Sequence, residues 1–203
     1  MKYIIVSLFA LVLFASCAKN HKRVIVMSKG STEFDESTKT IKAVDGTGHE
    51  EKTMDFSEAA LSLQIDAPAG KTSIELKEKG LFILNVKKDT IIGSYQNYTA
   101  PKLQKNLLTQ DDLKLKIDSL QQLTTGKNIS AANRNFFILP NQLVKISDNI
   151  EAIIVGPYHQ MRTAEKVDGV DPEVYRFYSI REIRETIGKL EALTKPTVPE
   201  SNK

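Results

Sequence analysis

Two polar stretches in the second half of the chain carry the side chains best suited to binding or catalysis. The first, residues 128–135, reads Asn-Ile-Ser-Ala-Ala-Asn-Arg-Asn and sets amide groups around one guanidinium. Arg134 can hold a carboxylate or phosphate with two parallel hydrogen bonds, and the amides of Asn133 and Asn135 can satisfy sugar or peptide groups. We favour the simpler interpretation, in which these side chains cap and bridge a helix-to-strand turn.

The second stretch follows an apolar strand and the dipeptide Gly156-Pro157. It contains Tyr158, His159 and Arg162, and functional loops often begin at a strand end. His159 titrates in the range useful for acid–base chemistry, but no acidic partner can be assigned to it from sequence. We therefore predict both stretches as candidate ligand-binding residues and assign no catalytic residue.

The sequence offers little support for a metal or cofactor site. The densest group of metal-ligand types is Asp45 with His49, Glu50 and Glu51, and it lies in a loop loosened by glycines, so a solvated loop is the favoured interpretation. The sequence contains no Gly-x-Ser-x-Gly and no phosphate-binding loop. We predict no metal, no cofactor and, because the formal charge is only +3, no nucleic-acid partner.

The elements that must position these loops are mostly strands. Leu61, Leu63 and Ile65 alternate with polar residues, which is typical of a half-buried strand, and Pro68-Ala69-Gly70-Lys71 is strong turn chemistry. Further strands are predicted from their apolar content, with tight hairpin turns at 140–141 and 148–149. These strands are 24–27, 40–44, 74–76, 81–86, 90–95, 136–139, 142–146 and 150–155. Residues 173–178 fit either a strand or a helix.

Two amphipathic helices are predicted near 109–125 and 179–194. The first begins with the capping pair Thr109 and Asp112, and the second with a capping box of Ser179 and Glu182. Each repeats apolar residues at three- and four-residue intervals. The fold class is therefore α+β, with mainly antiparallel β structure as a meander or a small sandwich. We divide the body into a β-rich domain over 23–98, an α+β portion over 99–195 and a disordered tail over 196–203.

The N-terminus carries a targeting signal. Met1-Lys2 precedes an apolar run from Tyr3 to Ala15, which is shorter than the roughly 20 residues that span a bilayer and has the form of a signal peptide. Leu13-Phe14-Ala15-Ser16-Cys17 resembles a bacterial lipobox, and the chain is similar in style to Bacteroidota lipoproteins. The resemblance implies removal of residues 1–16 and lipidation of Cys17, the only cysteine. A plain secretory signal remains the alternative.

A short segment, 17–22, then links the anchor to the first strand. Its basic residues, with Arg23, either attract anionic headgroups or form an ordinary flexible tether. Surface-exported Bacteroidota lipoproteins carry acidic residues after the cysteine, so Lys19, His21 and Lys22 favour an outer-membrane protein facing the periplasm.

The sequence thus predicts a membrane-anchored cell-envelope lipoprotein that acts as a binding or structural component. Its partners are the membrane, through lipidated Cys17, and an envelope protein. A non-catalytic role is favoured. An envelope hydrolase acting on glycan or cell-wall material is the alternative, as is a small-ligand carrier with an apolar cavity in its β body.

Overall fold

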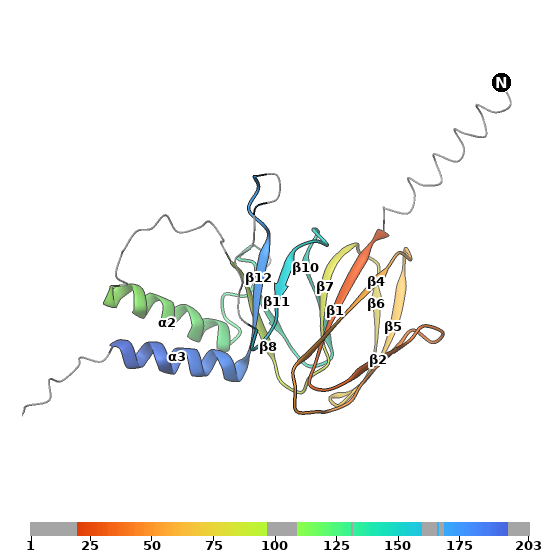
Figure 1. Cartoon of the computed structure of the whole chain (residues 1–203), viewed down its shortest axis with the longest axis horizontal. Helices are drawn as coiled ribbons and strands as arrows, with labels where there is room; N and C mark the ends of the chain where they lie inside the picture. Colours follow the sequence, from red (N-terminus) through yellow and green to blue (C-terminus); the bar gives the residue numbers. More distant parts are fainter. Residues whose placement is uncertain (1–19, 97–108, 131, 160–165, 167–168, 195–203) are drawn as a thin grey trace, which may run out of the picture. The chain divides into compact units, whose positions relative to one another are not determined.

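The computed structural model describes residues 20–96, 109–130, 132–159, 166 and 169–194 (Figure 1). The chain divides into two compact units. Unit 1 takes the residues up to Thr90 together with Ile138–Ala152, and unit 2 takes Ile91–Phe137 with the residues from Ile153 onward. Residues 138–152 thus return to the first unit after the chain has entered the second. The boundary predicted at 98–99 lies outside the described residues.

Unit 1 is a sandwich of two four-stranded sheets. The first has the order β10-β7-β1-β4, with β10 (Gln142–Ser147), β7 (Gly80–Asn85), β1 (Lys22–Ser28) and β4 (Glu50–Phe56). The second has the order β2-β3-β5-β6, with β2 (Thr32–Asp35), β3 (Thr40–Ala43), β5 (Leu61–Ala67) and β6 (Gly70–Leu76). Their facing side chains form one apolar core.

The first strand lies in the interior of its sheet. β1 is antiparallel to β4 on one side and parallel to β7 on the other. Val24 and Val26 enter the core, while Ile25 and Met27, on the opposite face of the strand, are also buried. An apolar run such as Val24–Met27 is expected for a strand covered on both faces.

Unit 2 contains one four-stranded sheet and two helices. The sheet order is β11-β12-β8-β9, with β11 (Ile153–Val155), β12 (Val174–Ser179), β8 (Ile91–Gln96) and β9 (Asn135–Ile138). Helices α2 (Gln110–Thr124) and α3 (Ile180–Thr194) lie side by side (Figure 1). Their apolar residues pack with Ile92, Phe137 and Tyr178 of the sheet, so the helices cover one of its faces.

Both helix starts use the predicted capping residues. Thr109 and Asp112 form a complete capping box on α2. At α3, the Ser179 hydroxyl accepts from the Glu182 amide at 3.1 Å, whereas the Glu182 carboxylate accepts from Arg176 and from the Tyr158 amide. Within the described residues, no helix has the length and apolar content needed to cross a bilayer.

The α+β class, mostly β, is confirmed, but two local predictions are wrong. The hairpins expected at 140–141 and 148–149 do not form, because β9, β10 and β11 belong to three different strand pairings. Strands β2 and β4 were also missed. The first four residues of β4 are exposed, as suits the charged edge of a sheet, and they therefore give no apolar alternation.

Candidate functional site

Arg134 lies within a cluster of aromatic and acidic side chains in unit 2. Its Nε and Nη2 atoms donate to the Tyr175 hydroxyl at 3.2 and 2.6 Å, and Nη2 also bonds the Glu173 carboxylate. The central guanidinium carbon lies 3.7 Å from the centroid of the Tyr95 ring, a close cation–π contact. Glu173, the nearest carboxylate, thus lies where an anionic ligand would otherwise bind.

Tyr175 completes this Arg134 cluster from the middle of the sheet. Its side chain is almost fully buried, and its hydroxyl donates to Glu173 at 2.6 Å. Burial raises the pKa of the Tyr175 phenol, the hydrogen bond to Glu173 raises it further, and Arg134 opposes both effects. The phenol is therefore held neutral and serves as a bridge between the guanidinium and the carboxylate.

The neighbouring amides bridge the turn between α2 and β9. The Asn133 side chain donates to the Asn128 side-chain oxygen, and the Asn135 side chain donates to the Asn128 carbonyl at 3.1 Å. Asn128 and Arg134 both have positive φ, 60° and 51°, a backbone conformation for which asparagine is enriched among non-glycine residues. This stretch therefore holds a tight, polar turn in place.

Tyr158 and His159 contact the strand-to-helix corner where α3 begins. Arg176 donates to the His159 carbonyl and, at 2.9 Å, to the Glu182 carboxylate, which also accepts from the Tyr158 amide at 3.1 Å. The Ser179 hydroxyl bonds the Tyr158 hydroxyl at 2.9 Å. Arg176 and Glu182 thus form a largely buried ion pair. Arg162 lies outside the described residues.

The two candidate loops meet β12 on opposite faces. Arg134 bonds Tyr175, and His159 bonds Arg176, which is the next residue of the same strand. Successive side chains of a strand point to opposite faces of its sheet. These contacts therefore do not bring Arg134 and His159 together in one site.

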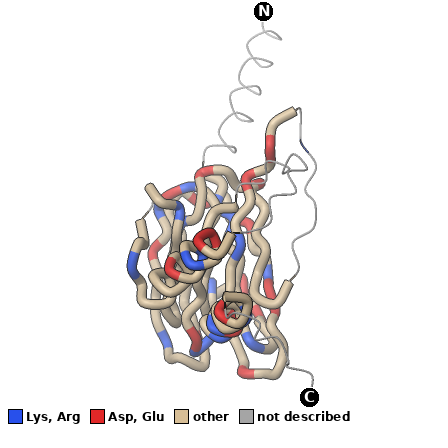
Figure 2. Tube along the Cα trace, turned by 90° about the vertical axis from the view of Figure 1, so that its left-hand side faces the viewer, with Lys and Arg blue, Asp and Glu red and all other residues tan. Residues whose placement is uncertain are grey.

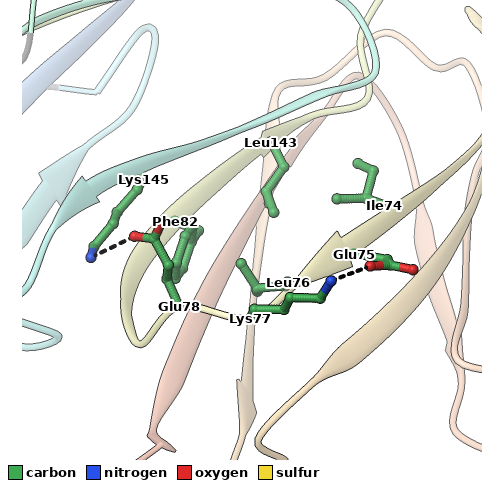
Figure 3. Close-up of a pocket in the computed structure, with 8 residues that line it drawn as sticks. All are labelled: Ile74, Glu75, Leu76, Lys77, Glu78, Phe82, Leu143 and Lys145. Carbon is green, nitrogen blue, oxygen red and sulfur yellow. Dashed lines mark hydrogen bonds and ion pairs between the residues drawn. The ribbon is translucent and has the colours of Figure 1, made fainter.

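Unit 1 has a surface hollow of about 400 Å³ between the end of β6, β7 and β10 (Figure 3). Its apolar wall comes from Ile74, Leu76, Phe82 and Leu143. Figure 3 shows two ion pairs at its rim, Lys77 with Glu75 and Lys145 with Glu78, at 2.9 and 3.0 Å. The hollow can accommodate an apolar group, and the charged side chains at its rim already pair with one another.

The start of β1 carries a feature that the basic segment did not predict. Lys22 is completely buried, and its ammonium donates to the carbonyls of Asn20, Glu58 and Ala59 at 3.1, 2.5 and 3.4 Å. A lysine has three donors, and all three have an acceptor here. Lys22 is therefore not available to a lipid headgroup.

The basic residues on either side of Lys22 are also engaged. His21 and Arg23 both bond the Asp55 carboxylate, at 3.1 and 2.9 Å, and Arg23 also reaches Glu151 and the Ile150 carbonyl. The hydrogen bond from Arg23 is the main cause that lowers the pKa of Asp55. Along the described chain, basic and acidic positions are interspersed (Figure 2).

Sequence reasoning missed the residues that complete these contacts. Tyr175 and Arg176 lie on β12, and Glu173 precedes the strand directly. Only the pairing of the strands identifies what these three side chains contact. The burial of Lys22 could not be expected from its residue type, since lysine is rarely fully buried.

No protein-family model, curated protein or solved structure matches this chain.

Proposed function

We propose that this chain is a bacterial cell-envelope lipoprotein, anchored through a lipid on Cys17, that acts as a non-catalytic binding or structural component at the membrane. Support for the anchor comes from Leu13-Phe14-Ala15-Ser16-Cys17 after a short apolar run. The basic residues that follow Cys17 support an outer-membrane position facing the periplasm.

The observation that carries the proposal is the position of β1. This strand begins at Lys22, five residues after Cys17, and is hydrogen-bonded on both sides, to β7 and to β4. Five residues extend over roughly 17 Å at most, and an inner strand cannot leave its sheet without breaking two ladders. A lipid on Cys17 would therefore hold the folded body against the membrane, and its partners would have to be there.

A binding or structural role is supported by the contacts that the Arg134 guanidinium makes within its own unit. Arg134 is engaged by Glu173, Tyr175 and Tyr95 of its own unit. An anionic substrate would have to displace Glu173, whose carboxylate already accepts hydrogen bonds from Arg134 and Tyr175. These contacts favour a structural role for Arg134 over the binding of an anionic substrate.

Crosslinking in the native membrane tests this proposal. Membranes from cells that make the full-length chain are treated with a crosslinker, and the captured proteins are identified by mass spectrometry, with Cys17→Ala as the control. A stoichiometric envelope protein captured only with Cys17 present supports the proposal. Turnover of envelope substrates by the purified protein, abolished by Arg134→Met without unfolding, would contradict it.

The hollow of unit 1 favours a second candidate, a carrier of a small ligand with an apolar body. Its volume of about 400 Å³ lies within the usual range of ligand pockets. A fluorescent apolar dye such as anilinonaphthalene sulfonate provides the test. Leu143→Gln, in the hollow, should weaken dye binding, whereas Leu139→Gln, half exposed outside it, should not. Equal binding by both variants would remove this candidate.

A further inference from the structure

We infer that the end of unit 1 at which β1 begins faces a phospholipid bilayer, with the turns 57–60 and 77–79 as its segments nearest the headgroups. This inference rests on the proposed lipid anchor and specifies which surface that anchor presents to the membrane.

Strand pairing defines the surface. Lys22 is the register partner of Phe56 in β4 and of Gly80 in β7. The turn 57–60 begins directly after Phe56, and the turn 77–79 ends directly before Gly80, whose amide donates to the His21 carbonyl at 3.1 Å. The two turns therefore flank the point where the chain enters the sandwich from Cys17.

The buried ammonium fixes this entry point. Lys22 lies on the same face of β1 as Val24 and Val26, so its side chain enters the end of the core, where it holds the carbonyls of Glu58 and Ala59. Fraying the start of β1 would take an ammonium and two carbonyls from their partners. The tether therefore cannot gain length by unravelling the strand, and its reach remains roughly 17 Å.

The charges of this end neither hold it to an anionic surface nor repel it. Lys77 pairs with Glu75, Lys39 with Glu58, and Lys145 with both Glu78 and Asp148. Lys79 is a further exposed cation of the turn, worth about 1 kcal/mol at most beside anionic lipid. Tether length, rather than charge, thus determines which end faces the bilayer.

The opposite end of β1 is the natural reference. From Lys22 to Ser28 the strand rises six residues, or roughly 20 Å, and Lys29 follows as an exposed residue. Ser57 at the near end is also exposed. If the inference holds, dyes at these two positions lie at clearly different depths from the headgroups.

The test uses the full lipidated chain in phosphatidylethanolamine–phosphatidylglycerol vesicles that contain a headgroup nitroxide. Because Cys17 is the only cysteine and lipid would occupy its sulfur, Ser57→Cys and Lys29→Cys each supply a single thiol for a fluorescent dye. We expect the nitroxide to quench the dye at position 57 several-fold more than the dye at position 29. Inserting about 20 Gly/Ser residues after Lys19, with a reach of roughly 25 Å, should remove that difference.

Equal quenching at the two positions, or stronger quenching at position 29, in a chain whose mass shows lipid on Cys17 would overturn this inference and leave the proposed function intact. A chain that carries no lipid on Cys17 would overturn both.

Discussion

The Lys22 ammonium donates to the Glu58 carbonyl across 2.5 Å from a side chain with no exposed surface. This contact joins the first residue of β1 to the turn between β4 and β5, 36 residues later in the chain. The short segment after Cys17 therefore leads directly into β1, a strand whose first residue is fixed to the turn between β4 and β5. The proposed anchor depends on this relationship, because it sets how far the body can move from the lipid.

Replacing Lys22 by Met should destabilise unit 1. Methionine keeps most of the volume but leaves the carbonyls of Glu58 and Ala59 without a donor, and each unsatisfied buried group costs about 1–3 kcal/mol. We expect the free energy of unfolding to fall by about 2–4 kcal/mol, measured by urea denaturation. Lys52→Met is the matched control, since the exposed Lys52 ammonium bonds one carbonyl, that of Thr32. Equal effects of the two substitutions would contradict this role for Lys22.

Gly93→Ala should disrupt unit 2. A Cβ at this position would lie 2.2 Å from the Phe177 ring, too close for any real contact, and overpacking of this kind costs about 1–3 kcal/mol or more. Gly188 in α3 has open space around it, so Gly188→Ala should stabilise the helix by up to about 1 kcal/mol. Thermal unfolding followed by circular dichroism checks both. A tolerated Gly93→Ala would mean that β8 and β12 are not packed as described.

Arg134→Met should lower stability by about 1–3 kcal/mol, because it removes the ion pair between Arg134 and the partly buried Glu173 carboxylate. Arg134→Lys should restore only part of the loss, since an ammonium cannot reproduce the guanidinium contacts with Tyr175 and Tyr95. Arg181→Met is the control, because that side chain is 81% exposed in a pair within α3 and should change stability by less than about 0.5 kcal/mol.

The same substitution offers a spectroscopic readout. Arg134 opposes the rise in the pKa of Tyr175, so Arg134→Met should raise that pKa further. An ultraviolet titration of the phenols, with Tyr175→Phe to identify the signal, measures it. An unchanged or lower pKa would show that the guanidinium does not face the Tyr175 phenol.

The ion pair of Asp55 with Arg23 should make the stability of unit 1 depend on pH in the acid range. The hydrogen bond from Arg23 lowers the pKa of Asp55 in the folded state below the value of about 3.9 in an unfolded chain. The stability that Asp55 contributes is thus present above pH about 4 and is lost as the pH falls through its lowered folded-state pKa. Asp55→Asn should weaken unit 1 at pH 7 and flatten the loss of stability in acid, whereas exposed Asp118→Asn should do neither. Denaturation midpoints between pH 2 and pH 7, about the range of linkage for a carboxylate, check this.

Local sequence signals predicted the elements whose determinants are local. The capping pair of Thr109 and Asp112 and the alternation of Leu61, Leu63 and Ile65 lie within a few residues of each other, and both predicted elements form. β4 could not be predicted in this way, because its exposed start gives no pattern and its partner, β1, lies more than twenty residues earlier.

The candidate sites show the same limit. Asn133, Arg134 and Asn135 were singled out for their chemistry, but the sequence could not show that Glu173, 39 residues later, meets Arg134. Nor could it show that Arg134 and His159 contact opposite faces of the sheet, because this follows from the alternation of Tyr175 and Arg176 on one strand. For Lys22, the basic stretch predicted either attraction to anionic headgroups or a flexible tether, whereas the structure places the ammonium among three carbonyls.

The most direct test of the anchor is the mass of the N-terminal peptide of the protein purified from bacterial membranes. The account predicts a mature chain that begins at Cys17, with a diacylglyceryl group on its sulfur and an acyl group on its new amine. A mature chain whose Cys17 is an unmodified thiol, or a chain that retains residues 1–16, would contradict it.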